Sequence, residues 1–164
     1  MKVILARSAG FCWGVRRAVD KARSLAQGRE GPVRTDGPLI HNRQMMETLA
    51  SEGIREWDGK EPLANATLLI RAHGASPDRR QQLMTLPCDL EDATCPDVAR
   101  IQGLIRKHAR EGYQILIFGD PGHAEVIGLE GHAEGKGHVV SRPEDVSGLS
   151  IREPVCLVSQ STQL

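Results

Sequence analysis

The sequence lacks several features that would place it in familiar protein classes. Lysine plus arginine equals aspartate plus glutamate at 21 each, so no net charge draws the chain toward nucleic acid or an anionic membrane. No apolar run approaches the roughly 20 residues of a membrane-spanning helix. The first residues also lack the apolar core and cleavage site of a secretory leader. These absences predict a cytoplasmic protein without a nucleic-acid or membrane partner.

Several common site motifs are missing as well. No Cys-x-x-Cys pair is present, which disfavours a structural zinc site without excluding zinc. The glycine spacings Gly10-x-x-x-Gly14 and Gly119-x-x-Gly122 match neither the phosphate loop nor the dinucleotide fingerprint. A cysteine–histidine hydrolase remains an alternative, but it would use one cysteine and leave a second, similarly placed one unexplained.

The composition is that of an ordinary globular chain. With 164 residues, 40% of them hydrophobic and 26% charged, the sequence can bury one core or two compact halves. In a reducing compartment its four cysteines are expected to be ligands, reactive thiols or core residues rather than disulfides. Cys88 and Cys156 fall in strand-like stretches and are interpreted as core, whereas Cys12 and Cys95 have loop surroundings.

Apolar periodicity predicts alternating strands and helices, and therefore an α/β fold with mostly parallel sheets covered by helices. In the first unit we expect strands at 2–6, 38–40, 67–71 and near Leu90, and helices at 15–26, 43–51, 77–84 and 97–110. A second unit would hold strands at 114–118, 137–140 and 154–158 and a short helix from Glu125. We place the division between residues 1–96 and 97–164. The pattern stops where another helix would follow, which suggests a truncated protein.

Chemically useful side chains follow the expected strands. In an open parallel sheet, ligands bind at the carboxyl ends of the strands, where loops lead into helices. Residues of this kind would meet at one rim of one sheet and form a pocket there; they are Cys12, His41, His73, Cys95, His123, Glu125, Ser161 and Thr162.

Each of these residues also has a plain structural interpretation. A single loop histidine is more often solvated or held in the core than functional, and this applies more strongly to His108, His132 and His138. The pairs Arg16-Arg17 and Arg79-Arg80 are interpreted as solvated helix faces. The functional hypothesis rests on the coincidence of so many polar residues at strand ends.

The two loop cysteines carry the most specific signal. Cys12 and Cys95 each stand where a helical pattern begins, and Pro96 is suited to the first position of a helix. A thiol at a helix amino terminus faces unpaired backbone N–H groups and the positive end of the helix dipole. This setting favours the thiolate, which is the form that binds iron or attacks electrophiles.

Six motifs in this order resemble those of the 4-hydroxy-3-methylbut-2-enyl diphosphate reductase family, from residue 2 to the last residue. They are Gly10-Phe11-Cys12-x-Gly14-Val15, Ile40-His41-Asn42-Arg43, Ala72-His73-Gly74, Asp92-Ala93-Thr94-Cys95-Pro96, His123-x-Glu125-Val126-x-Gly128 and Ser159-Gln160-Ser161-Thr162. The resemblance implies reductive dehydroxylation of an allylic diphosphate to isopentenyl and dimethylallyl diphosphates in the non-mevalonate isoprenoid pathway.

The resemblance also assigns a cofactor, partners and residue roles. It implies a 4Fe–4S cluster held by three cysteines, with Cys12 and Cys95 as two of them, reduced by ferredoxin or flavodoxin. His41, His73 and His123 would surround the diphosphate. Glu125 would supply or relay a proton, aided by the hydroxyl groups of Ser161 and Thr162. Ser161 stands where the family usually has threonine, and Ala124 replaces a usual proline.

The main departure from the family is that the motif with the third cluster cysteine has no counterpart here. The resemblance implies two of the family's three α/β domains, truncated before the third, and Cys88 and Cys156 do not take the missing ligand's place. We therefore expect the isolated chain to be inactive or nearly so. The alternative is a non-catalytic α/β remnant that binds a diphosphate or a protein partner without a cluster.

Overall fold

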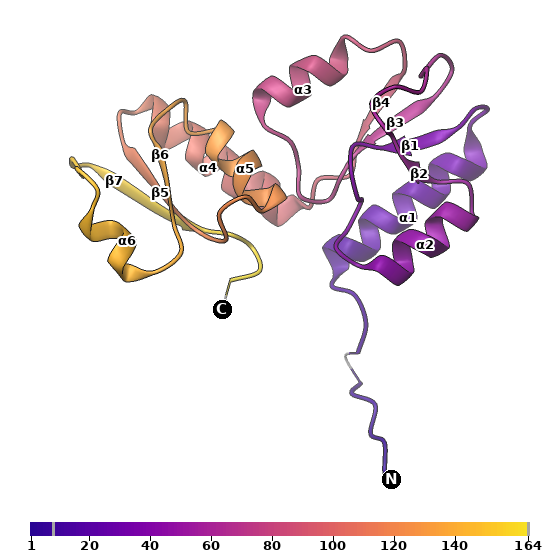
Figure 1. Ribbon diagram of the computed structural model, residues 1–164, viewed down its shortest axis with the longest axis horizontal. Helices are drawn as coiled ribbons and strands as arrows, with labels where there is room; N and C mark the ends of the chain where they lie inside the picture. The colour runs from indigo at the N-terminus through magenta and orange to yellow at the C-terminus, as the bar shows by residue number, and fades with distance from the viewer. Residues whose placement is uncertain (8, 164) are drawn as a thin grey trace.

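The computed structural model describes residues 1–7 and 9–163, which form alternating helices and strands (Figure 1). The elements are α1 (Trp13–Gly28), β1 (Val33–Thr35), α2 (Arg43–Ser51), β2 (Arg55–Glu56), β3 (Thr67–Ile70), α3 (Pro77–Met84), β4 (Asp89–Asp92), α4 (Pro96–Arg110), β5 (Gln114–Phe118), α5 (Ala124–Gly131), β6 (Gly137–Val140), α6 (Pro143–Ser147) and β7 (Val155–Ser159).

The strands make two parallel sheets. The first has the order β2-β1-β3-β4 and the second the order β6-β5-β7, and every neighbouring pair runs parallel. In the first unit α1 and α2 lie on one side of the sheet and α3 on the other (Figure 1). The helix-covered parallel sheets confirm the predicted fold class. Parallel strands need such crossover helices because a tight turn cannot join them.

Three apolar clusters stabilise this arrangement. Ala18, Val19 and Ala22 of α1 pack on one face of the first sheet, and Leu83 of α3 packs on the other. The second unit has its own core, in which Ile105, Val126 and Leu129 are almost completely buried. Burial of these apolar side chains is the main favourable contribution to folding.

Most predicted elements agree with the structure, and the clearest cases are α2, α3, β5 and β6, whose bounds match the predicted ones. The predicted strand at 2–6 is wrong. The chain there is extended but unpaired, with Val3, Ile4 and Leu5 at least 78% exposed. A strand requires a partner for its backbone hydrogen bonds, and no described residue pairs with this segment.

The predicted strand at 38–40 is also wrong, although Leu39 and Ile40 are buried as a strand residue would be. They lie in a bend, where Leu39 O accepts a hydrogen bond from Ala72 N. The strand at this place in the sheet is β1, where the sequence pattern predicted no strand. The short elements β2 and α6 were not predicted, because two to five residues show too little periodicity.

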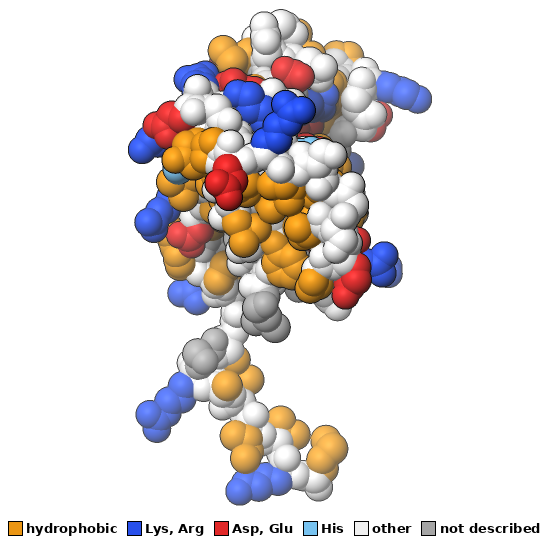
Figure 2. All heavy atoms as spheres, turned by 90° about the vertical axis from the view of Figure 1, so that its left-hand side faces the viewer, with side chains coloured by type: hydrophobic (Ala, Val, Ile, Leu, Met, Phe, Trp, Pro, Cys, Tyr) orange, Lys and Arg blue, Asp and Glu red, His pale blue; other side chains and the backbone are white. Residues whose placement is uncertain are grey.

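The second sheet is covered unevenly. Helices α4 and α5 contact β5, β6 and β7, and the short helix α6 contacts β6. On β7, Leu157 is 68% exposed. Figure 2 shows the face of the molecule that lies on the left-hand side of Figure 1. Apolar side chains gather in the middle of this face, with charged side chains around them. No helix among the described residues combines the length and apolarity needed to cross a membrane.

Candidate functional site

Three histidines from separate loops converge at the carboxyl ends of the strands. His41 follows the Leu39-Ile40 bend, His73 follows β3, and His123 caps the amino terminus of α5. The ring centres of His41 and His73 lie 4.3 Å apart, those of His41 and His123 4.8 Å, and those of His73 and His123 5.4 Å. The predicted convergence is therefore present, but its members come from two sheets rather than from one.

The three imidazoles line a pocket of about 240 Å³. Phe11 and Val15, which flank the Cys12 loop, form part of its wall, and Thr162 closes it from the last loop of the chain. In Figure 1 the chain leaves β7 in the direction of the first unit, in agreement with this contact. The pocket thus lies between a cysteine-bearing loop and the end of the second sheet.

The surroundings of the pocket favour the neutral forms of His41 and His73. Burial lowers the pKa of His73 to about 4, with further lowering by His41, His123 and Arg71. Burial, His123 and Arg71 also lower the pKa of His41. A neutral imidazole offers one N–H donor and one acceptor nitrogen. An anion bound in the pocket would raise the pKa of His41 and His73, because negative charge favours the protonated ring.

The side-chain nitrogens of His41, His73 and His123 lie within 4.8 Å of one another, close enough to suggest a metal ion. The hydrogen bonds favour an anion instead. His123 Nδ1 accepts a hydrogen bond from Glu125 N at 3.1 Å, so in the neutral ring the proton is on Nε2. A metal at Nε2 would require that proton to leave, and the neighbouring guanidinium of Arg71 would repel a cation.

Glu125 is the most deeply buried acid of the site, with 1% of its surface exposed. Its Oε1 accepts a hydrogen bond from Ser161 N at 2.6 Å, and its Oε2 accepts one from Ser161 Oγ at 2.7 Å. This pair joins the start of α5 to the loop after β7. A carboxylate bonded to a hydroxyl group can exchange a proton with a neighbouring group.

Gln160 holds the same loop from the other side. Its Oε1 accepts a hydrogen bond from Asp120 N at 2.9 Å, and its Nε2 donates to Thr162 Oγ1 at 2.8 Å. The side chain is 1% exposed, and a Cβ atom at Gly119 would lie 2.9 Å from its Oε1. Gln160 therefore fixes both the loop before His123 and the hydroxyl group that lines the pocket.

Cys12 and Cys95 are the N-caps of α1 and α4, as the sequence predicts, and neither thiol makes a side-chain capping bond. Cys12 is exposed and Cys95 is partly exposed. A Cβ atom at Gly14 would lie 2.5 Å from Cys95 Sγ, so the two helix starts meet closely and Gly14 leaves room for the second thiol. Two free thiols at adjoining helix amino termini fit the ligands of an iron–sulfur cluster.

The other two cysteines do not join this pair. Cys156 lies on β7 and packs against the core of the second unit, and Cys88 packs beneath α3 near Leu83. Burial raises the pKa of both thiols. Their interpretation as core residues agrees with these positions.

The sequence-based hypothesis omitted Arg71 and Gln160. Arg71 directly follows the buried strand β3, and its Nε has no hydrogen-bond partner among the described residues. Its positive charge contributes to the lowered pKa of His41 and His73. An arginine directly after the apolar run Leu68-Leu69-Ile70 was a usable signal, because a buried cation needs an anion. The only sequence signal for Gln160 was its place between Ser159 and Ser161.

The comparisons with known proteins agree with one another. The family model described as LytB protein matches residues 3–164. A relative from Opitutus terrae named 4-hydroxy-3-methylbut-2-enyl diphosphate reductase is 51% identical over 99% of this chain and 60% of its own length. One of the same name from Aquifex aeolicus is 38% identical over 98% of this chain and 57% of its own length.

Two solved structures share the fold. One, described as the structure of (E)-4-hydroxy-3-methyl-but-2-enyl diphosphate reductase, the terminal enzyme of the non-mevalonate pathway, is 38% identical with a TM-score of 0.87. The match covers 99% of this chain and 59% of that one. A Plasmodium falciparum reductase is 29% identical with a TM-score of 0.88, covering 96% of this chain and 50% of its own. The chain spans a little over half the length of such proteins.

Proposed function

The chain belongs to the LytB family, and from this premise we propose that it provides the diphosphate pocket and two of the cluster ligands of a 4-hydroxy-3-methylbut-2-enyl diphosphate reductase. One observation carries the proposal. Three histidines and Thr162 line one pocket beside the loop of a free cysteine at a helix start, and Glu125 binds Ser161 directly before Thr162. Recognition of an anion and delivery of a proton are both needed at one place in this reaction.

The proposed reaction removes a hydroxyl group from an allylic diphosphate. Two electrons and two protons convert the alcohol into an alkene and water. A 4Fe–4S cluster, when bound by Cys12 and Cys95 with a third ligand, supplies the electrons singly and a Lewis-acidic iron. We propose ferredoxin or flavodoxin as the electron donor, as the resemblance implies. The cytoplasm, proposed as its compartment, suits four cysteines that are all free.

The residues of this chain have separate roles in the proposal. The N–H groups of His41, His73 and His123 donate hydrogen bonds to the diphosphate oxygens, and Arg71 adds positive charge behind them. Glu125 moves a proton to the departing hydroxyl group, with Ser161 and Thr162 orienting that group. The polypeptide divides into units 1–96 and 97–164, a proposal that the two separate sheets support.

Calorimetric titration with 4-hydroxy-3-methylbut-2-enyl diphosphate, pyrophosphate and inorganic phosphate tests the proposal. We expect the first two to bind and single phosphate to bind far more weakly. His41→Ala or His73→Ala is expected to weaken binding about tenfold or more, because each removes a hydrogen bond to a charged group. His108→Ala, on the exposed side of α4, is the matched control. Equal binding by His73→Ala and His108→Ala would contradict the proposed pocket.

A further inference from the structure

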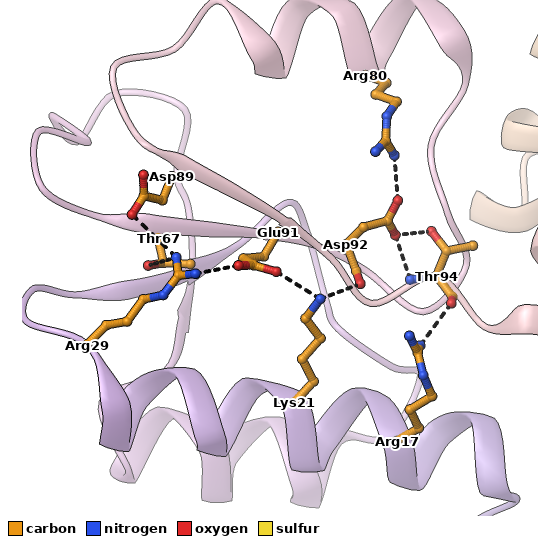
Figure 3. A network of polar contacts seen from close by, with 9 residues as sticks. All are labelled: Arg17, Lys21, Arg29, Thr67, Arg80, Asp89, Glu91, Asp92 and Thr94. Carbon is orange, nitrogen blue, oxygen red and sulfur yellow. Dashed lines mark hydrogen bonds and ion pairs between the residues drawn. The ribbon is translucent and has the colours of Figure 1, made fainter.

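The two cysteine-bearing helix starts are joined by a polar network at the end of β4 (Figure 3). Its central part, here called the β4 clamp, consists of Arg17, Lys21, Asp92 and Thr94. Arg17 and Lys21 project from α1, which begins directly after Cys12, and Asp92 and Thr94 form the turn directly before Cys95. The network therefore connects precisely the two segments that carry the loop thiols.

Within the turn, the carboxylate of Asp92 fixes the backbone. Its Oδ1 accepts hydrogen bonds from Thr94 N at 2.8 Å and from Thr94 Oγ1 at 2.5 Å, and its Oδ2 accepts one from Arg80 at 2.5 Å. Burial of this carboxylate opposes ionisation, but the donors outweigh it and leave the pKa of Asp92 below its usual range. The turn that leads to Cys95 is thus held by a charged group.

Between the two segments, cations of α1 bind the carbonyl groups of the same turn. Lys21 Nζ donates to Asp92 O at 2.9 Å and forms an ion pair with Glu91 at 2.9 Å. Arg17 Nη1 donates to Thr94 O at 3.2 Å, one residue before Cys95. Figure 3 shows both side chains rising from α1 to the end of β4.

The turn is also tied to the histidine pocket. Cys95 N donates to Ala72 O at 2.8 Å, and Ala72 directly precedes His73. On the other side, the space at Gly14 admits Cys95 Sγ against α1. Cys95 is therefore held between the start of α1 and the end of β3. A change in the clamp would therefore move its thiol relative to Cys12.

Arg17 belongs to a pair that the sequence pattern assigned to a solvated helix face. That interpretation suits Arg16, which is exposed and has no side-chain hydrogen bond among the described residues. Arg17 is exposed as well, but its side chain points about 100° away from that of Arg16 and also reaches the Cys95 turn. Arg79 is partly exposed and Arg80 is exposed, and they also form ion pairs with Asp36 and Asp92.

We propose that Arg17 and Lys21, acting through the Asp92–Thr94 turn, are positioning residues that set the separation of the Cys12 and Cys95 thiols for a shared thiophilic metal centre. This proposal rests on the proposed function for the identity of the centre, but the geometry of the thiol pair is independent of iron. Removing a residue that orients a metal ligand without binding the metal itself commonly lowers the metal affinity by about 10- to 100-fold.

Anaerobic titration of the chain with Cd²⁺, which paired thiolates bind tightly, tests the clamp through thiolate-to-metal charge-transfer absorbance. We expect wild-type protein to bind Cd²⁺ in a manner lost in Cys12→Ser and Cys95→Ser. The double variant Arg17→Met/Lys21→Met should bind about tenfold more weakly. Arg16→Met is the matched control and should bind like wild type, as should Lys21→Arg, which keeps a positive charge at this position.

The outcomes separate the clamp from general stability and from the proposed function. Wild-type affinity in the double variant would overturn the clamp, as would equal weakening by Arg16→Met. If the double variant unfolds, Thr94→Val, which removes only the hydroxyl donor to Asp92, should still weaken Cd²⁺ binding in folded protein; unchanged binding there would also overturn the clamp. If Cys12 and Cys95 together bind Cd²⁺ but no iron–sulfur cluster assembles, the result would count against the proposed function. The proposed role of the clamp would then still be supported.

Discussion

Replacing Glu125 with alanine is expected to lower the free energy of unfolding by about 3 kcal/mol. Glu125 is 1% exposed and accepts hydrogen bonds from the backbone and the hydroxyl group of Ser161. Each hydrogen bond to a charged group contributes roughly 1.5–3 kcal/mol, and the desolvation of the carboxylate offsets part of the sum. Urea unfolding followed by circular dichroism measures the difference.

The same helix offers a matched control for this prediction. Glu130 lies on the exposed side of α5, and Glu130→Ala should change stability by no more than about 0.5 kcal/mol. Glu125→Gln keeps the shape and one acceptor oxygen, so its loss should fall between the two. Equal stability of the Glu125→Ala and Glu130→Ala proteins would mean that the contact with Ser161 does not hold the last loop against α5.

Acidification from pH 6.5 to 4 is expected to destabilise the protein through His73. Burial and the neighbouring charges lower the pKa of His73 in the folded state from 6.5 to about 4. Between pH 6.5 and 4 the unfolded chain therefore binds a proton at His73 that the folded chain does not bind. Stability falls as the pH falls through this range. The full shift corresponds to about 3 kcal/mol, which solvent access to the half-buried ring reduces to about 2 kcal/mol.

A comparison between variants isolates this contribution from that of the carboxylates. His73→Gln should unfold with a flatter dependence on pH between 6.5 and 4, whereas His138→Gln on β6 should follow wild type. His41, whose pKa is lowered for similar reasons, adds in the same direction. Identical pH dependence of the His73→Gln and wild-type proteins would show that His73 is not kept neutral by the pocket.

Local sequence patterns predict the parts of this site that depend on one strand and its following loop. His73 after β3, His123 before α5 and the two N-cap cysteines were placed correctly, because apolar periodicity marks where strands end and helices begin. The rule that ligands bind at the carboxyl ends of parallel strands then predicts that these loops lie close together. This level of the site requires no knowledge of long-range contacts.

The remaining features depend on partners far apart in the sequence. The segment 2–6 has the composition of a strand but finds no strand beside it, and Leu39 and Ile40 are apolar because a bend is buried. Arg17 contacts a carbonyl group 77 positions away. Gln160 joins two loops separated by 40 positions. No periodicity of a single segment encodes such pairings.

Anaerobic reconstitution with iron and sulfide, in the presence of a free thiol as a further ligand, tests most directly the claim that this chain carries two cluster ligands. The measurement is the iron content per chain together with the visible absorbance. We predict iron–sulfur absorbance in wild type, Cys88→Ser and Cys156→Ser, and its loss in both Cys12→Ser and Cys95→Ser. Iron bound equally by all of these proteins, or by none of them, would contradict the account.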